Sequence, residues 1–487
     1  MAIPIGHQQI RDFSSGMMTE TADSITPNNV MRLILNMDTS VIGQLQVRKG
    51  TTAIGDQLED GKSILGLYQF KDSGAGAYSQ QIAAVDNSGS TQSVTEYNNS
   101  GTWTGITDGG TFTAGAKYRF ETFLDLVFMV NSAFDGPKSW NGNPASGWGT
   151  GQLTSAPAGE FIKVYKDRIY IAATSANPDR LYYSTVPDSN GDITWDTGAT
   201  GLWIDINPED GENITGLEEN STTLLIFKDQ SMYRWNGSST EADKIIDVGC
   251  SSSDSIATRH GKTFFFNPKG IYVTQGGYPQ RISKPIQRWI DAIAVAYYND
   301  VAGVCDEDHY YCSIGDVTVD GEAYTNVVLV YEISTQNWTV RSYAEQITVF
   351  ANFIKSDGTE AVMVGNDDGD VQEFNSGDND AGSAIVYRVK TIRLSFVNSF
   401  AYEKMFSEIH AFGRGLIGAQ TIVHVEEDKS PRSIGELFTQ WWMYVEGLKY
   451  RGRWFVFELT GTAVDTDTAE FWGWEITNGQ VVSKGGK

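Results

Sequence analysis

One pattern recurs along most of this 487-residue chain and constrains its fold more than any other feature. The pattern is a short apolar run, a tight turn and a second run rich in β-branched and aromatic residues. It is clearest at residues 223–235, where residues 228–230 form the turn, and at 263–274, where Pro268 and Gly270 mark it. The apolar runs are too short for ordinary helices, so the pattern indicates a β-hairpin.

Five further copies of the hairpin are present in the sequence. Three precede these two, at residues 81–97, 126–140 and 168–184, and two come after them, at 310–331 and 361–374. Their starts lie roughly 40–55 residues apart, which is the period expected of propeller blades. A single four-stranded sheet cannot bury both of its faces, so such units pack face to face in a ring. We therefore predict an all-β fold with a β-propeller of about seven blades, although six or eight blades would also fit the uneven spacing.

The propeller is expected to occupy only the middle of the chain, residues 51–376. Residues 1–50 are predicted to form a polar extended arm and an alternating hairpin. That hairpin could supply the strand that closes the ring and removes its open edges. After a sharp change of composition at residues 375–383, longer strands predict a small β-sandwich-like domain over residues 384–487. Abundant glycine, 51 residues, suits the many turns of this arrangement.

One short helix is expected within the propeller, at residues 285–293. Ser283 stands before it as a credible N-cap, and Pro285 falls in its first turn. We expect this helix to pack against one blade.

The formal net charge of −25 argues against a conventional nucleic-acid binder, which needs a basic surface to displace counterions from phosphate. Two interpretations stay open: the acidic surface keeps the protein soluble, or it lets nucleic acid pass without sticking. The three cysteines, Cys250, Cys305 and Cys312, give no disulfide framework and fit synthesis in a reducing compartment. The first residues lack the pattern of a signal peptide, and no apolar run is long enough for a membrane-spanning helix.

A glycine-containing stretch at residues 55–63 resembles a phosphate-binding P-loop but has one residue too many between its glycines. The P-loop precedes a helix, whereas a strand is expected here at residues 64–68. Acidic side chains at Asp56, Glu59 and Asp60 would also repel phosphate. We interpret the stretch as a surface turn.

Two groups of residues could in principle hold a metal ion. Cys305, His309 and Cys312 lie close in sequence, but strand alternation would direct His309 and Cys312 to opposite faces of a sheet. Residues 366–370 offer oxygen ligands but lack the bidentate glutamate and the spacing of an EF-hand loop. We interpret them as a half-buried strand and a blade turn, and we predict no metal site.

No catalytic constellation stands out either. Residues 188–195 echo the Asp-box turn of sialidase-type propellers, but they carry an extra residue before Gly191 and have no second copy. No Gly-x-Ser-x-Gly motif is present, and the histidines show no nucleophile–base pattern. We therefore predict a protein without catalytic residues, cofactor-binding residues or a cofactor. The histidines are His7, His260, His309, His410 and His424.

The beginning of the chain carries a recognisable sequence motif. Residues 12–16 form a glycine-containing arm, and Asn36 ends an alternating strand. Gly43 and Leu45 then lead to a basic pair followed by glycine at residues 48–50.

The middle of the chain continues the same order of segments. Residues 167–172 with 180–184 make up one motif, which ends in Tyr-Ser, and residues 248–250, 268–272 and 279–283 make up the following one. The ordered set, over residues 10–400, resembles the tail hub or nozzle proteins of short-tailed bacteriophages (podoviruses). Within that group it is similar to the tail tubular protein B-like and packaged-DNA-stabilisation-like family. The C-terminal region matches no part of that family.

The resemblance implies a structural virion protein of the phage tail, synthesised in the bacterial host cytoplasm. It would form a homohexameric ring below the portal and the adaptor, or head–tail connector, and support tail fibre, tailspike or tip attachment. Genomic DNA would pass through the lumen without sequence-specific binding. Six copies would carry a formal charge of −150, six times −25, and an acidic lumen would let DNA slide.

Two other functions stay open from the residues alone. One is a carbohydrate-binding or glycan-degrading β-propeller, and the other is a cytoplasmic scaffold that recruits partners through its loops. In the main hypothesis the protein is not an enzyme.

Overall fold

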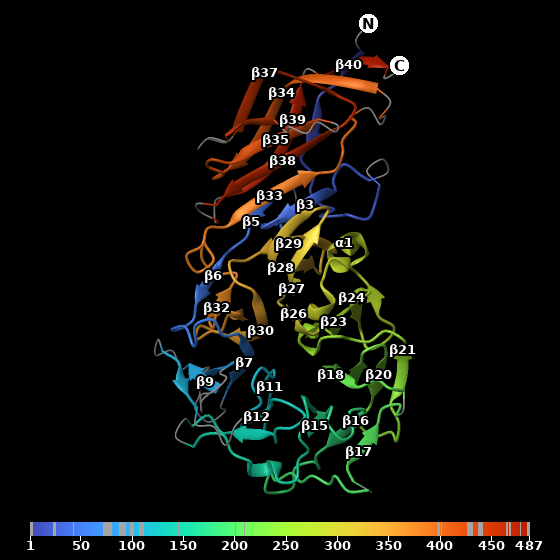
Figure 1. The fold of residues 1–487 in the computed structure, drawn as a ribbon, viewed down its shortest axis with the longest axis vertical. Coiled ribbons are helices and arrows are strands. Elements are labelled where there is room, and N and C mark those ends of the chain that lie inside the picture. Colours follow the sequence, from blue (N-terminus) through green and yellow to red (C-terminus); the bar gives the residue numbers. More distant parts are fainter. Residues whose placement is uncertain are drawn as a thin grey trace.

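The computed structural model describes residues 3–22, 26–41, 43–71, 80–86, 94–97, 102–106, 112–143, 146–199, 201–208, 210–396, 400, 402–425, 432–436, 442–463, 466, 469–477 and 479–484. Regular structure in these residues is almost entirely β (Figure 1). The single α-helix among them, α1 (Gln287–Asp291), has five residues. None of the helices in the described ranges is long and apolar enough to cross a membrane.

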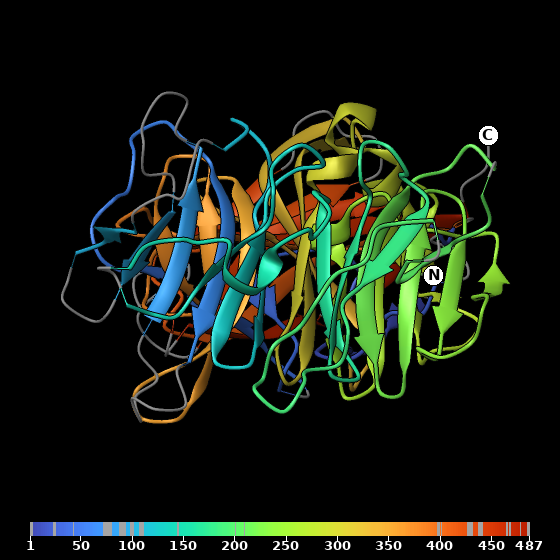
Figure 2. The same ribbon diagram turned by 90° about the horizontal axis from the view of Figure 1, so that it is seen from below.

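Seven antiparallel units surround a central axis in the lower part of Figure 1, and Figure 2 shows their strands side by side from below. Blade 1 contains β7 (Ile64–Phe70), β8 (Gln80–Val85), β9 (Val94–Tyr97) and β10 (Thr104–Gly105). Blade 2 contains β11 (Arg119–Phe123), β12 (Leu126–Val130) and β13 (Lys138–Trp140). Blade 3 contains β14 (Phe161–Tyr165), β15 (Arg168–Ala172), β16 (Arg180–Tyr183) and β17 (Trp203–Asp205).

The ring continues through four more units. Blade 4 contains β18 (Ile214–Asn220), β19 (Thr223–Lys228), β20 (Met232–Trp235) and β21 (Asp243–Ile246). Blade 5 contains β22 (Ala257–Arg259), β23 (Lys262–Asn267), β24 (Gly270–Thr274) and β25 (Gln280–Arg281). Blade 6 contains β26 (Ala302–Cys305), β27 (His309–Val319), β28 (Glu322–Glu332) and β29 (Asn337–Ser342). Blade 7 contains β30 (Ile347–Ile354), β31 (Glu360–Asn366), β32 (Val371–Phe374) and β6 (Thr51–Ala53).

The innermost strands close the ring. Each contacts the innermost strand of the next blade, and β30 of blade 7 contacts β7 of blade 1. The predicted all-β propeller is therefore confirmed, with seven blades. All seven predicted hairpins form the second and third strands of a blade.

The strand that completes the last blade lies just beyond the hairpin predicted to do so. Thr51 pairs with Phe374 and Ala53 with Gln372, so β6 becomes the outer strand of blade 7. Residues 29–50 form β3 (Met31–Leu35), β4 (Met37–Asp38) and β5 (Leu45–Val47), and these strands join the C-terminal sheets. The prediction of closure by residues 29–50 was wrong because their apolar side chains complete the C-terminal core.

Two sheets enclose that C-terminal core. The first sheet runs β1 (Ile3–Ile5), β40 (Gly479–Lys484), β34 (Tyr402–Arg414), β39 (Glu470–Thr477), β5 and β4, with β2 (Gln8–Ile10) on β39 and β37 (Trp442–Gly452) on β34. The second runs β3, β33 (Val386–Thr391), β38 (Phe455–Thr462), β35 (Gln420–Val425) and β36 (Arg432–Glu436). Phe406, Phe457 and Trp474 are buried between them.

The sandwich is neither independent of the N-terminus nor separate from the propeller. Besides the N-terminal strands that it takes in, its second sheet continues into blade 6, because β3 pairs in parallel with β29 through Leu35 and Val340. The result is a nine-stranded sheet shared by both bodies. The predicted domain bounds, residues 384–487, were therefore too narrow, because the N-terminal strands supply part of this domain's core and sheets.

The predicted helix is present but begins differently. A 3₁₀ turn, Lys284–Ile286, leads into α1, with Pro285 in that turn. Ser283 does not cap it with its side chain, because its hydroxyl accepts a hydrogen bond from the backbone of Ile271 at 2.9 Å. Trp289 and Ile290 are buried in a core shared by blades 5 and 6.

Candidate functional site

A buried arginine lies where the arm, blade 6 and the linker after blade 7 meet; we name this place the joint. The Arg48 side chain is fully buried, and its two terminal nitrogens donate to the carboxylate oxygens of Asp380 at 2.8 and 2.7 Å. It also donates to Asn36 in the arm and to the carbonyl of Ser342 at the end of β29. The guanidinium lies 4.0 Å from the ring centre of Tyr343. One side chain thus ties three segments together.

The backbone around Arg48 is equally constrained. A β-carbon at Gly50 would overlap the carbonyl oxygen of Asn379, and Gly16 has a φ of +60° beside Asn337. Asn36 is buried and has a φ of +56°. Glycine is favoured at such positions because it has no side chain to collide. The joint therefore selects particular residue types.

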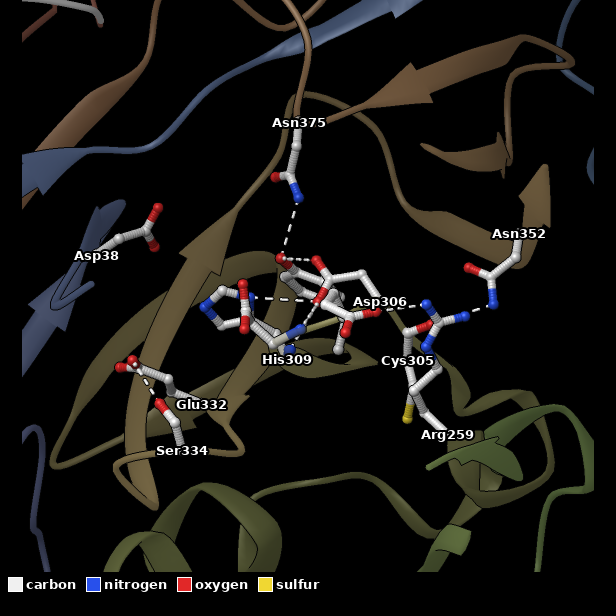
Figure 3. A network of polar contacts seen from close by, with 12 residues as sticks. Asp38, Arg259, Cys305, Asp306, His309, Glu332, Ser334, Asn352 and Asn375 are labelled. Carbon is white, nitrogen blue, oxygen red and sulfur yellow. Dashed lines mark hydrogen bonds and ion pairs between the residues drawn. The ribbon is translucent and has the colours of Figure 1, made fainter. Parts of the chain in front are cut away.

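A second buried arginine, Arg341, extends the joint into a polar network, part of which is drawn in Figure 3. Arg341 donates to both carboxylate oxygens of Asp38 at 3.0 Å and to the side-chain oxygen of Asn375. Asn375 donates to the hydroxyl of Tyr311, which in turn donates to Asp306 at 2.9 Å. Burial would raise the pKa of the Asp306 carboxyl, but hydrogen bonds from His309 and Tyr311 hold it below its usual value.

The residues considered for zinc divide between two faces of blade 6. Cys305 and Cys312 lie in the core shared with blade 5, whereas His309 lies beside Tyr311 on the opposite face. Figure 3 shows the Cys305 sulfur directed away from His309. The predicted separation of His309 and Cys312 is confirmed. Among the described residues, no group of three or more His, Cys, Asp or Glu side chains could hold a metal ion.

The P-loop-like stretch and the acidic stretch at 366–370 pack against each other; we name this contact the latch. The Gln57 side chain donates to the carbonyl of Asp368 at 2.6 Å, and the backbone of Gly61 donates to the Asp368 carboxylate at 3.0 Å. A β-carbon at Gly369, whose φ is +87°, would overlap the carbonyl of Glu59. Both stretches are turns, as interpreted, and together they secure β6 and the entry to blade 1 on blade 7.

The Asp-box-like stretch is a local turn between β16 and β17. The carboxylate of Asp188 accepts hydrogen bonds from the backbone of Asn190 at 2.8 Å and Asp192 at 3.0 Å. Trp195 is buried in the core between blades 2 and 3. The contacts close the loop on itself.

The histidines have local partners, most of them carboxylates. His410 instead stacks on Phe412. The carboxylate pairs are His7 with Glu475, His260 with Glu307, His309 with Asp306 and His424 with Glu458.

The axis of the propeller is a channel of about 510 Å³ lined by strands from all seven blades. Lys163 on β14 pairs with Glu121 on β11 and with Glu218 on β18, both at 3.0 Å. Asp254 pairs with Lys117 at 2.6 Å and Arg119 at 3.1 Å. Burial would lower the pKa of Lys163, but the two carboxylates raise it. The channel is thus crossed by ion pairs that join blade 3 to blades 2 and 4, and blade 2 to the segment before blade 5.

Ion pairs also cross the outer face of the shared sheet. Glu458 on β38 accepts from His424 at 2.8 Å and pairs with Arg388, which also contacts Glu322 of blade 6 at 2.6 Å. Burial alone would raise the pKa of Glu458, but the hydrogen bonds from His424 and Arg388 lower it to about 2. These contacts bridge the propeller and the sandwich.

A groove of about 1050 Å³ runs beside this bridge, between α1, the arm and the second sheet. Its lining includes two acidic and five basic side chains, an unusual balance in a chain with 61 acidic and 36 basic residues. We name it the basic groove, after Arg32, Arg288, Lys390, Arg393 and Arg453.

The charged residues of the channel and of the bridge between the two bodies were not predicted from the sequence, although each left a signal. Lys163 stands between Ile162 and Val164, and Glu458 stands between Phe457 and Leu459. A charged residue inside an apolar strand is rarely buried without a partner. The signal identifies the position but not the partner, which comes from another strand.

Comparisons with known proteins assign the chain to no family. No family model and no curated protein matches it. Among solved structures, YCF48 from Cyanidioschyzon merolae is similar, with 11% identity and a TM-score of 0.42 over 66% of this chain and 98% of that one. The CNH domain of AfRom2 gives 10% identity and a TM-score of 0.41, over 66% and 98% of the two chains. The WD40 domain of Pan2 from Neurospora crassa gives 6% identity and 0.39, over 64% and 88%.

Proposed function

We propose that this protein is a structural, non-catalytic component of the tail of a short-tailed bacteriophage, a hub or nozzle subunit. The observation that carries the proposal is the location of four of the residues behind the family resemblance. Gly16, Asn36, Arg48 and Gly50 all lie buried in the joint. These residues fix how the arm and the linker meet the propeller. A motif shared with the family at the joint therefore favours an architecture shared with the family.

The rigidity of the fold supports a structural role. The nine-stranded sheet passes from blade 6 into the sandwich without a flexible connection, and the latch holds the two ends of the ring together. Neither body can rotate on the other without breaking backbone hydrogen bonds and buried ion pairs. A tail component that carries fibres and meets the adaptor needs such a body.

In this proposal, six copies form a ring and genomic DNA passes between them, not through a subunit. The axial channel of one propeller, about 510 Å³, has the volume of a small-molecule pocket and is crossed by ion pairs. A ring with a charge of −25 per copy would disfavour adhesion of DNA to its lumen. The basic groove is a suitable contact for an acidic surface of a neighbouring tail component.

Imaging and mass measurement test the proposal directly. We expect the full chain, alone or isolated from virions, to form six-fold rings with a mass roughly six times 53.6 kDa. An antibody against the chain should label the tail of intact virions. A monomer that is absent from virions and degrades glycans would contradict the proposal and favour the carbohydrate-active alternative. A monomer that joins the tail during assembly would still support it.

A further inference from the structure

A pocket of about 470 Å³ lies between blade 5 and the turn that joins β28 to β29 of blade 6. Figure 1 shows these two blades beside each other. The floor of the pocket is apolar and aromatic, since Phe264 and Tyr331 line it and are 1% and 6% exposed. The volume lies within the range of small-ligand pockets, which combine an apolar floor with a few convergent polar groups.

Three glutamine side chains, Gln275, Gln280 and Gln336, surround the pocket and are exposed. Each amide offers two donors and an acceptor. No hydrogen bond joins any of the three amides to another residue in the described part of the chain. The pocket therefore presents paired donors and acceptors to whatever enters it.

Lys262 adds a positive charge at the same place. It is half-buried, and within the described ranges it has neither an ion pair nor a hydrogen bond through its side chain. None of the described residues that line the pocket is acidic, in a chain with 61 acidic residues. A partly buried lysine commonly lays its methylene stem along apolar surface and keeps its ammonium in water, where an incoming ligand can reach it. Its natural complement here is an anionic group from outside.

The rim is held in place before any ligand arrives. The hydroxyl of Thr274 donates to the carbonyl of Gly277 at 2.7 Å and accepts from the backbone of Gly276 at 3.1 Å. This closed turn carries Tyr278, which is 77% exposed although it is a large aromatic residue. A fixed loop loses little conformational entropy on binding. The exposed ring offers an apolar face with a polar edge.

We propose that this pocket binds a saccharide that bears a carboxylate, such as a hexuronic acid unit. The amides would pair with neighbouring hydroxyl groups, the ring of Tyr278 would cover a C–H face of the sugar, and Lys262 would bind the carboxylate. Such a site goes beyond the structural role. It would let the protein attach to acidic polysaccharide while the ring serves as a conduit.

Titration calorimetry on the full chain tests this site with three probes: glucuronate, a hyaluronan tetrasaccharide and the neutral sugar maltotetraose. We expect the acidic tetrasaccharide to bind more tightly than the neutral one. Lys262→Met should weaken the acidic tetrasaccharide about tenfold or more and leave the neutral one unchanged. Tyr278→Ala should weaken both. If glucuronate binds as well as the tetrasaccharide, the ligand is a single sugar; tighter tetrasaccharide binding indicates a polymer.

Two matched variants control for unspecific effects. Lys284→Met removes an exposed lysine outside the pocket, and Phe134→Ala removes a 78% exposed aromatic of blade 2. Both should bind all probes like the wild type, and thermal melts should show that all variants remain folded. The proposal is overturned if no probe binds saturably, if Lys262→Met affects both tetrasaccharides equally, or if inorganic phosphate competes fully. Ring formation is measured separately, so loss of sugar binding leaves the proposed tail function standing.

Discussion

The joint places the Arg48 side chain, 0% exposed, against Asp380, which is 7% exposed. The axial channel instead leaves Lys163 21% exposed, beside Glu121 and Glu218 at 20% and 17%. Both sites contain ion pairs with good geometry, yet only the joint excludes water from its charges. Loss of one partner in water leaves a hydrated charge, whereas loss of one partner in the joint leaves a buried, uncompensated charge. The joint should therefore depend far more on each partner than the propeller ring does.

The largest effect is expected for Arg48→Met. Asp380 would keep its negative charge in the joint without a partner, so the free energy of unfolding should fall by about 3–5 kcal/mol. Urea denaturation followed by tryptophan fluorescence measures this. As a control, Arg234→Met removes an exposed pair with Asp243 and should cost less than about 1 kcal/mol. An Arg48→Met protein as stable as the Arg234→Met control would refute the distinction between the two sites.

The pH dependence of stability tests a second buried charge, Glu458, which belongs to the ion pairs between the propeller and the sandwich. Its folded pKa of about 2 lies below its usual value of 4.5, so its stabilising contribution is complete above pH 4.5. That contribution, about 3 kcal/mol, should be lost as the pH falls from 4.5 toward 2.

Unfolding measured at several pH values checks this prediction. Glu458→Gln should be less stable at pH 7 and should show a shallower decline on acidification than the wild type. Parallel curves for the two proteins would show that another group causes the acid sensitivity.

The regular part of the propeller was accessible from the sequence, whereas the contacts that join its ends were not. Short apolar runs such as residues 223–227, bounded by turn residues, define strands from the local sequence alone. The closing strand Thr51–Ala53 has three small residues and no apolar period, so its role depends on β32, more than 300 residues away. The parallel contact of Leu35 with Val340 is equally remote. Without a local signal, neither pairing could be predicted.

For the candidate sites too, local features could be predicted from the sequence and long-range contacts could not. The stretches at 55–63 and 366–370 were correctly interpreted as turns from their composition, because turn residues act locally. That the two turns hold each other could not be predicted, since Gly61 and Asp368 meet only after the ring has closed. The buried ion pairs needed the same information: Arg48 was visible in the sequence, but Asp380 as its partner was not.

The latch offers a test of the ring with an internal control. Gly369→Ala introduces a side chain at a φ of +87° and drives it into the carbonyl of Glu59, so we expect a loss of about 1–3 kcal/mol. Hydrogen exchange should accelerate at the backbone amides of β6. Gly358 has a φ of +84° with no atom within 4 Å of a β-carbon, so Gly358→Ala isolates the backbone strain, about 1 kcal/mol. Equal effects of the two substitutions would show that the latch does not hold β6.

The smallest effect is expected in the axial channel. Lys163→Met removes the cation that separates Glu121 from Glu218, but both carboxylates remain partly hydrated, so the free energy of unfolding should fall by only about 1 kcal/mol at pH 7. Burial already raises the pKa of Glu121, and without Lys163 this pKa should rise further. The stability lost at pH 7 should therefore return partly at pH 5, as one carboxyl takes up a proton, and Lys163→Met combined with Glu121→Gln should restore it at every pH. A loss as large as that of Arg48→Met would mean that the channel is as dry as the joint, and the contrast between the two sites would fail.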